Sequence, residues 1–238
     1  MALYENQFCR SVSENAGTSI LKRGGIEKRG LSKKEVFVRS TFDYMMEIIR
    51  KSECLDYCSA TLGTYKSGWR KTFSRADYIR HTLEKWLGDI TGILDRCLLL
   101  VNHVYDLGTK NEEVRYKLII SNKHISGEPV KSAIQKLNKV IGDYRPARNY
   151  VEHQGQFKDE KLDKLASEEF ILSQSKSLIK SGVLTVKKAA ALNVAVKLGF
   201  KFYVKDRKRE IKLMNTDIRK PIDEIFSALT DPYQKRTR

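Results

Sequence analysis

Apolar residues recur three or four positions apart through most of the chain, which is the spacing of an amphipathic helix. The longest such pattern follows Ser74, a residue type that caps helices, and stops before Gly108. It predicts a central core helix over about 74–107, roughly 50 Å long at 1.5 Å per residue. Its apolar positions are Ile79, Leu83, Trp86, Ile90, Leu94, Cys97, Val101 and Val104.

Further helices are predicted on both sides of this central helix. Ser32 and Glu35 have the spacing of a capping box at the start of the first one. Pro129 and Pro146 each follow a turn and suit the first position of a later helix. Together these patterns predict an all-α helical bundle over residues 35–198.

The two ends of the chain depart from this pattern. Residues 1–34 mix glycines with lysines and arginines and show little apolar periodicity, which predicts a basic, flexible arm. Near the other end, residues 200–204 and 211–214 alternate around a charged run. We therefore expect residues 199–238 to form a small C-terminal β-hairpin, followed by a helix that opens at Pro221.

The charge of the chain narrows the choice of partners. The 238 residues carry a formal net charge of +16, with 41% hydrophobic and 31% charged residues. This composition is that of a globular protein, and the charge favours RNA or another polyanion over an uncharged partner. No apolar run is long enough to cross a bilayer, and the N-terminus lacks the apolar region of a secretory signal. We expect a cytoplasmic protein without a membrane partner.

A second basic stretch is a candidate nucleic-acid surface. Lys66, Arg70 and Lys71 are interleaved with Tyr65 and Trp69, so aromatic rings could stack on bases while the cations neutralise phosphate. The more ordinary explanation is a packed tryptophan with a basic rim.

Neither a metal nor a cofactor is expected. The four cysteines include Cys54 and Cys58, whose spacing is not the Cys-x-x-Cys of a zinc knuckle or a redox site, and all four are expected to be reduced thiols. The chain contains no glycine-rich phosphate loop and no dinucleotide fingerprint.

The most informative short motif is Arg148-Asn149-Tyr150-Val151-Glu152-His153. Histidine exchanges protons near neutral pH, and arginine grips phosphate with two parallel hydrogen bonds. RNA supplies its own 2′-hydroxyl nucleophile, so Arg148, Asn149 and His153 suffice in principle for metal-free cleavage to a 2′,3′-cyclic phosphate. Arg145 just upstream would add a phosphate contact. The bland alternative is an i,i+4 surface ion pair between Arg148 and Glu152.

Helix geometry makes this hypothesis more specific. Five residues at 100° each place Arg148 and His153 about 140° apart around the helix axis. A single helix therefore does not stack them. Two copies facing each other across a two-fold axis would bring both residue types into one cleft, which predicts a homodimer.

The segment Tyr144–His153 resembles the signature of HEPN-domain proteins, in which an Arg and a His separated by four to six residues lie at the start of a late helix of a helical bundle. The resemblance covers residues 75–155 firmly and 36–200 loosely. It implies a dimeric, metal-independent endoribonuclease, often a toxin or an anti-phage defence protein with an antitoxin or defence-system partner. In the antitoxin-paired group a modified Tyr lies two residues after the His. Here that position is Gly155, so we do not expect that regulation.

Three functions follow as hypotheses. The first is a HEPN-type ribonuclease with Arg148, Asn149 and His153 as its site. The second is a non-catalytic helical protein that binds nucleic acid through its charge. The third is a subunit of a larger assembly, with its apolar helical faces against a partner.

Overall fold

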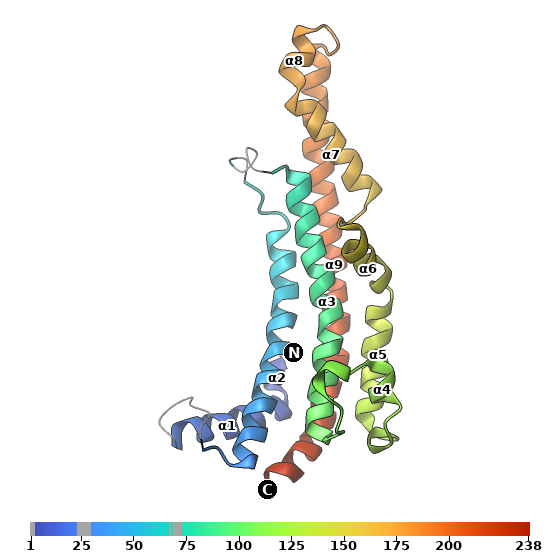
Figure 1. The fold of residues 1–238 in the computed structure, drawn as a ribbon. Coiled ribbons are helices and arrows are strands. Elements are labelled where there is room, and N and C mark those ends of the chain that lie inside the picture. The colour runs from blue at the N-terminus through green and yellow to red at the C-terminus, as the bar shows by residue number, and fades with distance from the viewer. Residues whose placement is uncertain (1–2, 23–29, 67, 69–72) are drawn as a thin grey trace. The chain divides into compact units, whose positions relative to one another are not determined.

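The computed structural model describes residues 3–22, 30–66, 68 and 73–238 of the chain. Every regular element of this described part is helical, so the predicted all-α fold is confirmed (Figure 1). In chain order the elements are η1 (Leu3–Glu5), α1 (Gln7–Lys22), α2 (Lys33–Thr61), α3 (Arg75–Tyr105), η3 (Asn111–Glu113), α4 (Tyr116–Ile120), η4 (Lys123–Ile125), α5 (Pro129–Gly142), α6 (Arg145–Gln154), α7 (Glu160–Ser173), α8 (Ser175–Lys180) and α9 (Val186–Thr237).

The chain divides into two compact units, and each is built from separate stretches of sequence. The first unit comprises residues 1–54, 89–145 and 215–238, and the second comprises 55–88 and 146–214. The long helices α2, α3 and α9 contribute to both units. All of α6 except its first residue belongs to the second unit.

Capping boxes fix the starts of the two long helices that the sequence predicted. The Glu35 amide donates to Ser32 Oγ over 3.2 Å, and the Ser32 amide donates to Glu35 Oε2 over 2.9 Å. Ser74 and Asp77 make the same reciprocal pair at the start of α3, at 3.3 and 3.0 Å. Such pairs satisfy amides that have no partner within the first helical turn.

The first unit has an apolar core that helices α1, α2, α3, α5 and α9 share. An ion pair between Lys51 and Asp89, 3.3 Å apart, links α2 to α3 at the edge of this core. The fully buried side chains of this core include Phe8, Met45, Ile48, Ile90, Cys97, Ile134, Leu137, Ile222 and Phe226.

The N-terminal segment is not the flexible arm that the sequence predicted. Residues 7–22 form α1, and residues 23–29 lie outside the described part of the chain. Phe8 and Val12 are completely buried, and the Phe8 ring stacks on Phe226 of α9 with centroids 5.6 Å apart. Because Phe226 lies more than two hundred positions away in the sequence, the local glycines and lysines hid this contact.

The predicted C-terminal β-hairpin is wrong, because residues 199–238 belong to the single helix α9 except at the very end. Phe200, Phe202 and Val204 alternate like a strand, but Phe202 is 59% exposed while the other two are buried. The buried set continues at three- to four-residue spacing, and the intervening lysines and arginines are good helix formers. Pro221 accordingly lies inside α9 rather than at the start of a new helix.

Close packing of α7 on α9 organises the second unit. Leu165 of α7 lies directly over Gly199 of α9, where an added Cβ would come within 2.5 Å of Leu165 Cδ2. Figure 1 shows α7 running beside the N-terminal half of α9. The buried side chains of this unit include Leu55, Leu62, Ile79, Leu83, Leu162, Phe200, Ile211 and Met214.

Two absences hold for the residues that the structure describes. None of the helices formed by these residues combines the length and the apolarity that crossing a membrane requires. Nor do three His, Cys, Asp or Glu side chains in this part of the chain gather into a group able to hold a metal ion.

Candidate functional site

The motif residues lie on α6, a short helix with no fully buried side chain. It starts directly after the turn that ends α5, as the proline at its second position favours. Gly155 closes it with φ +76°, and its amide donates to the Val151 carbonyl over 2.8 Å. A left-handed residue at this place is the common way to end a helix, and glycine adopts it without strain. The site is therefore presented on a short, sharply bounded helix.

Arg148 is held by two neighbours on its own helix. Its Nη2 lies 2.7 Å from Glu152 Oε1, and its Nη1 donates to Asn149 Oδ1 over 3.1 Å. Its Nε is buried without a hydrogen-bond partner. The surface ion pair between Arg148 and Glu152, which the sequence predicted as the non-functional alternative, is thus formed. The Asn149 side chain therefore contacts the arginine of the motif.

His153 lies in the last turn of α6, and its side chain is exposed to solvent. A histidine enclosed in the core could not reach an RNA backbone. Asn149 is exposed as well, and Arg148 is partly exposed, with 39% of its side chain accessible. All three motif side chains are therefore open to a ligand.

The basic residues proposed as nucleic-acid contacts have different surroundings. Arg145 donates from Nη2 to Asn138 Oδ1 of α5 over 2.7 Å, which occupies part of its guanidinium. Lys66 is exposed. Arg70 and Lys71 lie outside the described residues. Their role in binding nucleic acid stays a prediction.

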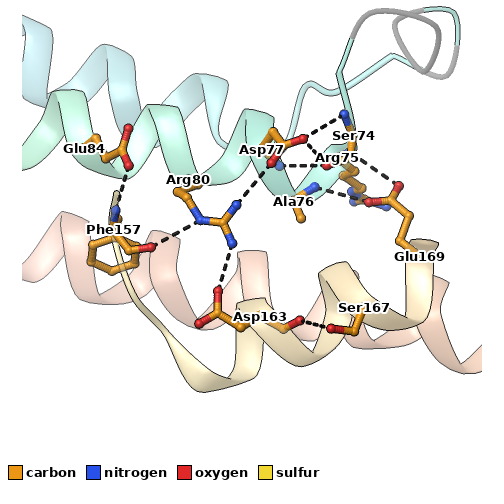
Figure 2. Close-up of polar contacts among 10 residues, drawn as sticks. All are labelled: Ser74, Arg75, Ala76, Asp77, Arg80, Glu84, Phe157, Asp163, Ser167 and Glu169. Atoms are coloured by element: carbon orange, nitrogen blue, oxygen red, sulfur yellow. Dashed lines mark hydrogen bonds and ion pairs between the residues drawn. The ribbon is translucent and has the colours of Figure 1, made fainter. Parts of the chain in front are cut away.

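A buried arginine fixes the segment that leaves the motif helix, as Figure 2 shows. Arg80 of α3 is only 8% exposed, and its Nε donates to the Phe157 carbonyl over 3.2 Å. The same guanidinium pairs with Asp77 at 3.1 Å and with Asp163 of α7 at 2.8 Å. Glu84, one turn further along α3, accepts the Phe157 amide over 2.7 Å. Both backbone polar groups of Phe157 are therefore held by α3.

These contacts make Arg80 and Glu84 positioning residues for the candidate site. The sequence did not predict this role for either residue. Phe157 follows His153 by four residues, so α3 anchors the chain just beyond the histidine. The sequence carried one usable signal, because Arg80 directly follows the apolar position Ile79 on a core helix. Nothing in the sequence indicates that its partner is a backbone carbonyl near residue 157.

Glu169 of α7 adds a second link to α3, also drawn in Figure 2. Its two carboxylate oxygens accept the backbone amides of Arg75 and Ala76 at 3.4 and 3.3 Å. These amides belong to the first turn of α3, where a negative charge is favourable. Helix α7 is thus attached to α3 at both Asp163 and Glu169.

Asp159 ties the same segment to α9. Its carboxylate caps α7 by accepting the Leu162 amide over 3.0 Å, and it also pairs with the Arg207 guanidinium. Only 8% of the Asp159 side chain is exposed. Burial opposes ionisation, but the hydrogen bonds from Leu162 and Arg207 outweigh it and lower the pKa of the Asp159 carboxyl.

This pKa shift predicts acid sensitivity. The pKa of Asp159 is lower in the folded protein than in the unfolded chain, where it lies near 4. The ionised carboxylate therefore stabilises the fold above about pH 4, and this stabilisation is lost as the pH falls through the pKa of the folded protein. Asp159→Asn keeps a good helix cap but removes the charge. We expect it to lower the free energy of unfolding by about 1–2 kcal/mol at pH 7. Urea titrations from pH 7 to pH 2.5 should show the difference between the two proteins shrinking; a constant difference would contradict this account.

Comparison with known proteins defines the class of this protein. The model of the HEPN_Cthe2314-like HEPN family matches residues 31–205, about three quarters of the chain. The chain therefore belongs to this HEPN family, and the predicted resemblance is confirmed. The match includes α6 with its Arg148–His153 motif and the α3 residues that anchor the segment after it. No curated protein and no solved structure gives a significant match.

Membership in this family supports a HEPN-type nuclease or a related function at a coarse level. HEPN domains often bind RNA and form dimers. These properties agree with the strongly basic composition of the chain and with the open motif on α6.

Proposed function

We propose that this protein is a metal-independent endoribonuclease that cleaves RNA through attack of the 2′-hydroxyl. The observation that supports it most is the placement of Arg148 and His153, both accessible, on one short helix of a HEPN-family chain. His153 removes the 2′-hydroxyl proton as the oxygen attacks the adjacent phosphorus. Arg148 binds the phosphate and stabilises the charge that builds on it, while Asn149 orients the guanidinium it already contacts.

The reaction breaks the bond between phosphorus and the 5′-oxygen of the next nucleotide. Its products are a 2′,3′-cyclic phosphate and a 5′-hydroxyl. The leaving oxygen needs a proton, and a second imidazole is the natural donor. The 140° offset between Arg148 and His153 favours a site that two chains share, with His153 of the partner subunit in that role. A toxin or defence role, with an antitoxin or defence-system partner, would follow from such an activity.

The test of this function is a defined, end-labelled RNA incubated with the protein in EDTA. We expect cleavage that survives the chelator and ends in cyclic phosphates. An RNA with a single 2′-deoxy nucleotide at the cleaved position should stay intact there. Cleavage that disappears with EDTA, or that continues at the deoxy position, would refute the mechanism.

A shared site also predicts that two inactive variants complement each other. In a random mixture of Arg148→Ala and His153→Ala chains, half of the dimers contain one chain of each kind. Each mixed dimer then keeps one Arg148 and one His153 in the shared cleft, so the mixture should cleave RNA faster than the two variants do separately, but at less than half the wild-type rate because the second imidazole is missing. The measurement is the initial rate after the mixed chains have exchanged. A rate no higher than the sum of the two variants would contradict a composite site.

A second candidate function is binding or assembly without cleavage. Val194, Leu198 and Phe202 of α9 follow each other at four-residue spacing and are 56%, 46% and 59% exposed. An exposed apolar row of this kind favours contact with a partner protein. Under this function the RNA remains intact, and replacing His153 changes neither RNA binding nor complex formation.

A further inference from the structure

Glu152 forms an ion pair with Arg148, the arginine that the proposed reaction needs. The Glu152 carboxylate lies 2.7 Å from Arg148 Nη2, and the two side chains are 48% and 39% exposed. Asn149 accepts from the other terminal nitrogen, Nη1. The third nitrogen, Nε, is buried against the protein. Both terminal nitrogens of Arg148 therefore have partners within α6, whereas Nε has none among the described residues.

Guanidinium geometry makes the position of Glu152 significant. Arginine grips a phosphate with two parallel hydrogen bonds, either through Nε and Nη2 or through Nη1 and Nη2. Both of these edges include Nη2, the nitrogen that pairs with Glu152. Because Nε is buried, a ligand must approach the edge formed by Nη1 and Nη2, and the Glu152 carboxylate beside Nη2 competes with a phosphate there and repels it. Nη1 and Nε, by contrast, contact no anion in this structure.

We propose that Glu152 is an acidic gate on Arg148, a competitor that an RNA phosphate must displace before the site is assembled. This inference rests on the proposed function and adds a mode of regulation to the same site. An exposed i,i+4 pair is weak, so a polyanion can displace it, whereas an isolated small anion gains little over the carboxylate already present. The gate thereby lowers occupation of Arg148 by free phosphate and favours a phosphodiester chain with several contacts.

The gate predicts the direction of one substitution. Glu152→Gln keeps the size of the side chain and removes its charge, so both the competing carboxylate and its repulsion of phosphate disappear. We expect the Kd for RNA to fall roughly three- to tenfold at low salt. Because Arg148 then contributes one more unneutralised charge, the slope of log K against log salt should steepen by about 0.7 for a single strand.

The experiment measures binding without cleavage. The probe is a short 2′-O-methyl RNA, which carries no free 2′-hydroxyl, titrated by fluorescence anisotropy at several salt concentrations. Glu113→Gln is the matched control, since Glu113 is an exposed acid on η3 and its loss changes the net charge equally. Arg148→Ala and the double variant Arg148→Ala with Glu152→Gln complete the set. In the arginine-free background the gain from Glu152→Gln should vanish.

The possible results distinguish a failure of the gate from a failure of the proposed RNA site. If Glu152→Gln binds no tighter than Glu113→Gln while Arg148→Ala weakens binding, the gate is wrong and the phosphate role of Arg148 stands. Weaker binding by Glu152→Gln would also overturn the gate, because it would make the carboxylate a support for Arg148. If Arg148→Ala binds as tightly as wild type, Arg148 does not contact RNA, and both the gate and the proposed site fail.

Discussion

Replacing His153 with alanine is expected to slow RNA cleavage by roughly a hundred- to ten-thousandfold, the usual contribution of a general acid or base. The side chain is exposed and fills no cavity, so the free energy of unfolding should stay within about 0.5 kcal/mol of wild type. Arg148→Ala should reduce cleavage by roughly a hundred- to a thousandfold through the lost stabilisation of the phosphorane charge. Its ion pair with Glu152 contributes only a few tenths of a kcal/mol to folding.

The control for this experiment is His81→Ala. His81 is also an exposed histidine, but it lies on α3 outside the motif, and its replacement should leave the rate unchanged. Initial rates on one labelled RNA and urea melts of each variant provide the two readouts. Equal slowing by His81→Ala would show that the loss is not specific to the motif.

The second large effect is expected from Arg80→Ala. The guanidinium is buried and serves Phe157, Asp77 and Asp163 together, so its removal leaves a backbone carbonyl and two carboxylates without their partner. Breaking a fully buried pair costs about 3–5 kcal/mol. Because Asp77 and Asp163 remain about half exposed, we expect about 2–3 kcal/mol here, or a fall in Tm of roughly 5–10 °C.

Arg96→Ala is the matched control for Arg80. Arg96 also lies on α3 and pairs with Glu47 at 3.2 Å, but both side chains are more than 40% exposed. Its loss should change the free energy of unfolding by less than about 0.5 kcal/mol. Thermal melts of both variants test the difference. Similar melting of the two variants would mean that the Arg80 contacts do not hold the segment after α6.

Most of the helical architecture could be predicted from the sequence, because it depends on local signals. The capping box at Ser32, the helix cap at Ser74 and the apolar row of α3 are formed as expected. The motif helix α6 begins one residue before Pro146, the predicted first position, and ends directly before Gly155, as predicted. The HEPN resemblance rested on the same local motif, and the family match confirms it.

The rest depends on contacts between distant parts of the chain. The packing of Phe8 on Phe226 orders α1, and no local pattern announces it. The alternation at Phe200, Phe202 and Val204 resembles a strand, but in the helix two of the three are buried and Phe202 is exposed. The bonds from Arg80 to Phe157 join residues 77 positions apart. Each of these features depends on the folded structure and has no signal in the local sequence.

The sequence left the Arg148–Glu152 pair as an argument against function. The structure forms that pair and gives it a different meaning, since Nε is buried and the carboxylate pairs with Nη2, a nitrogen of the guanidinium edge that a ligand can still approach. The pair is weak enough to yield to RNA, so its presence and a catalytic role for Arg148 are compatible.

The most direct test of the central claim is a time course of one defined RNA in EDTA with wild-type protein and with folded His153→Ala side by side. We predict fragments ending in 2′,3′-cyclic phosphate from the wild type and, over the same period, intact RNA from the variant. Intact RNA in both reactions, or full cleavage by the folded variant, would contradict the assignment of His153 and with it the proposed ribonuclease.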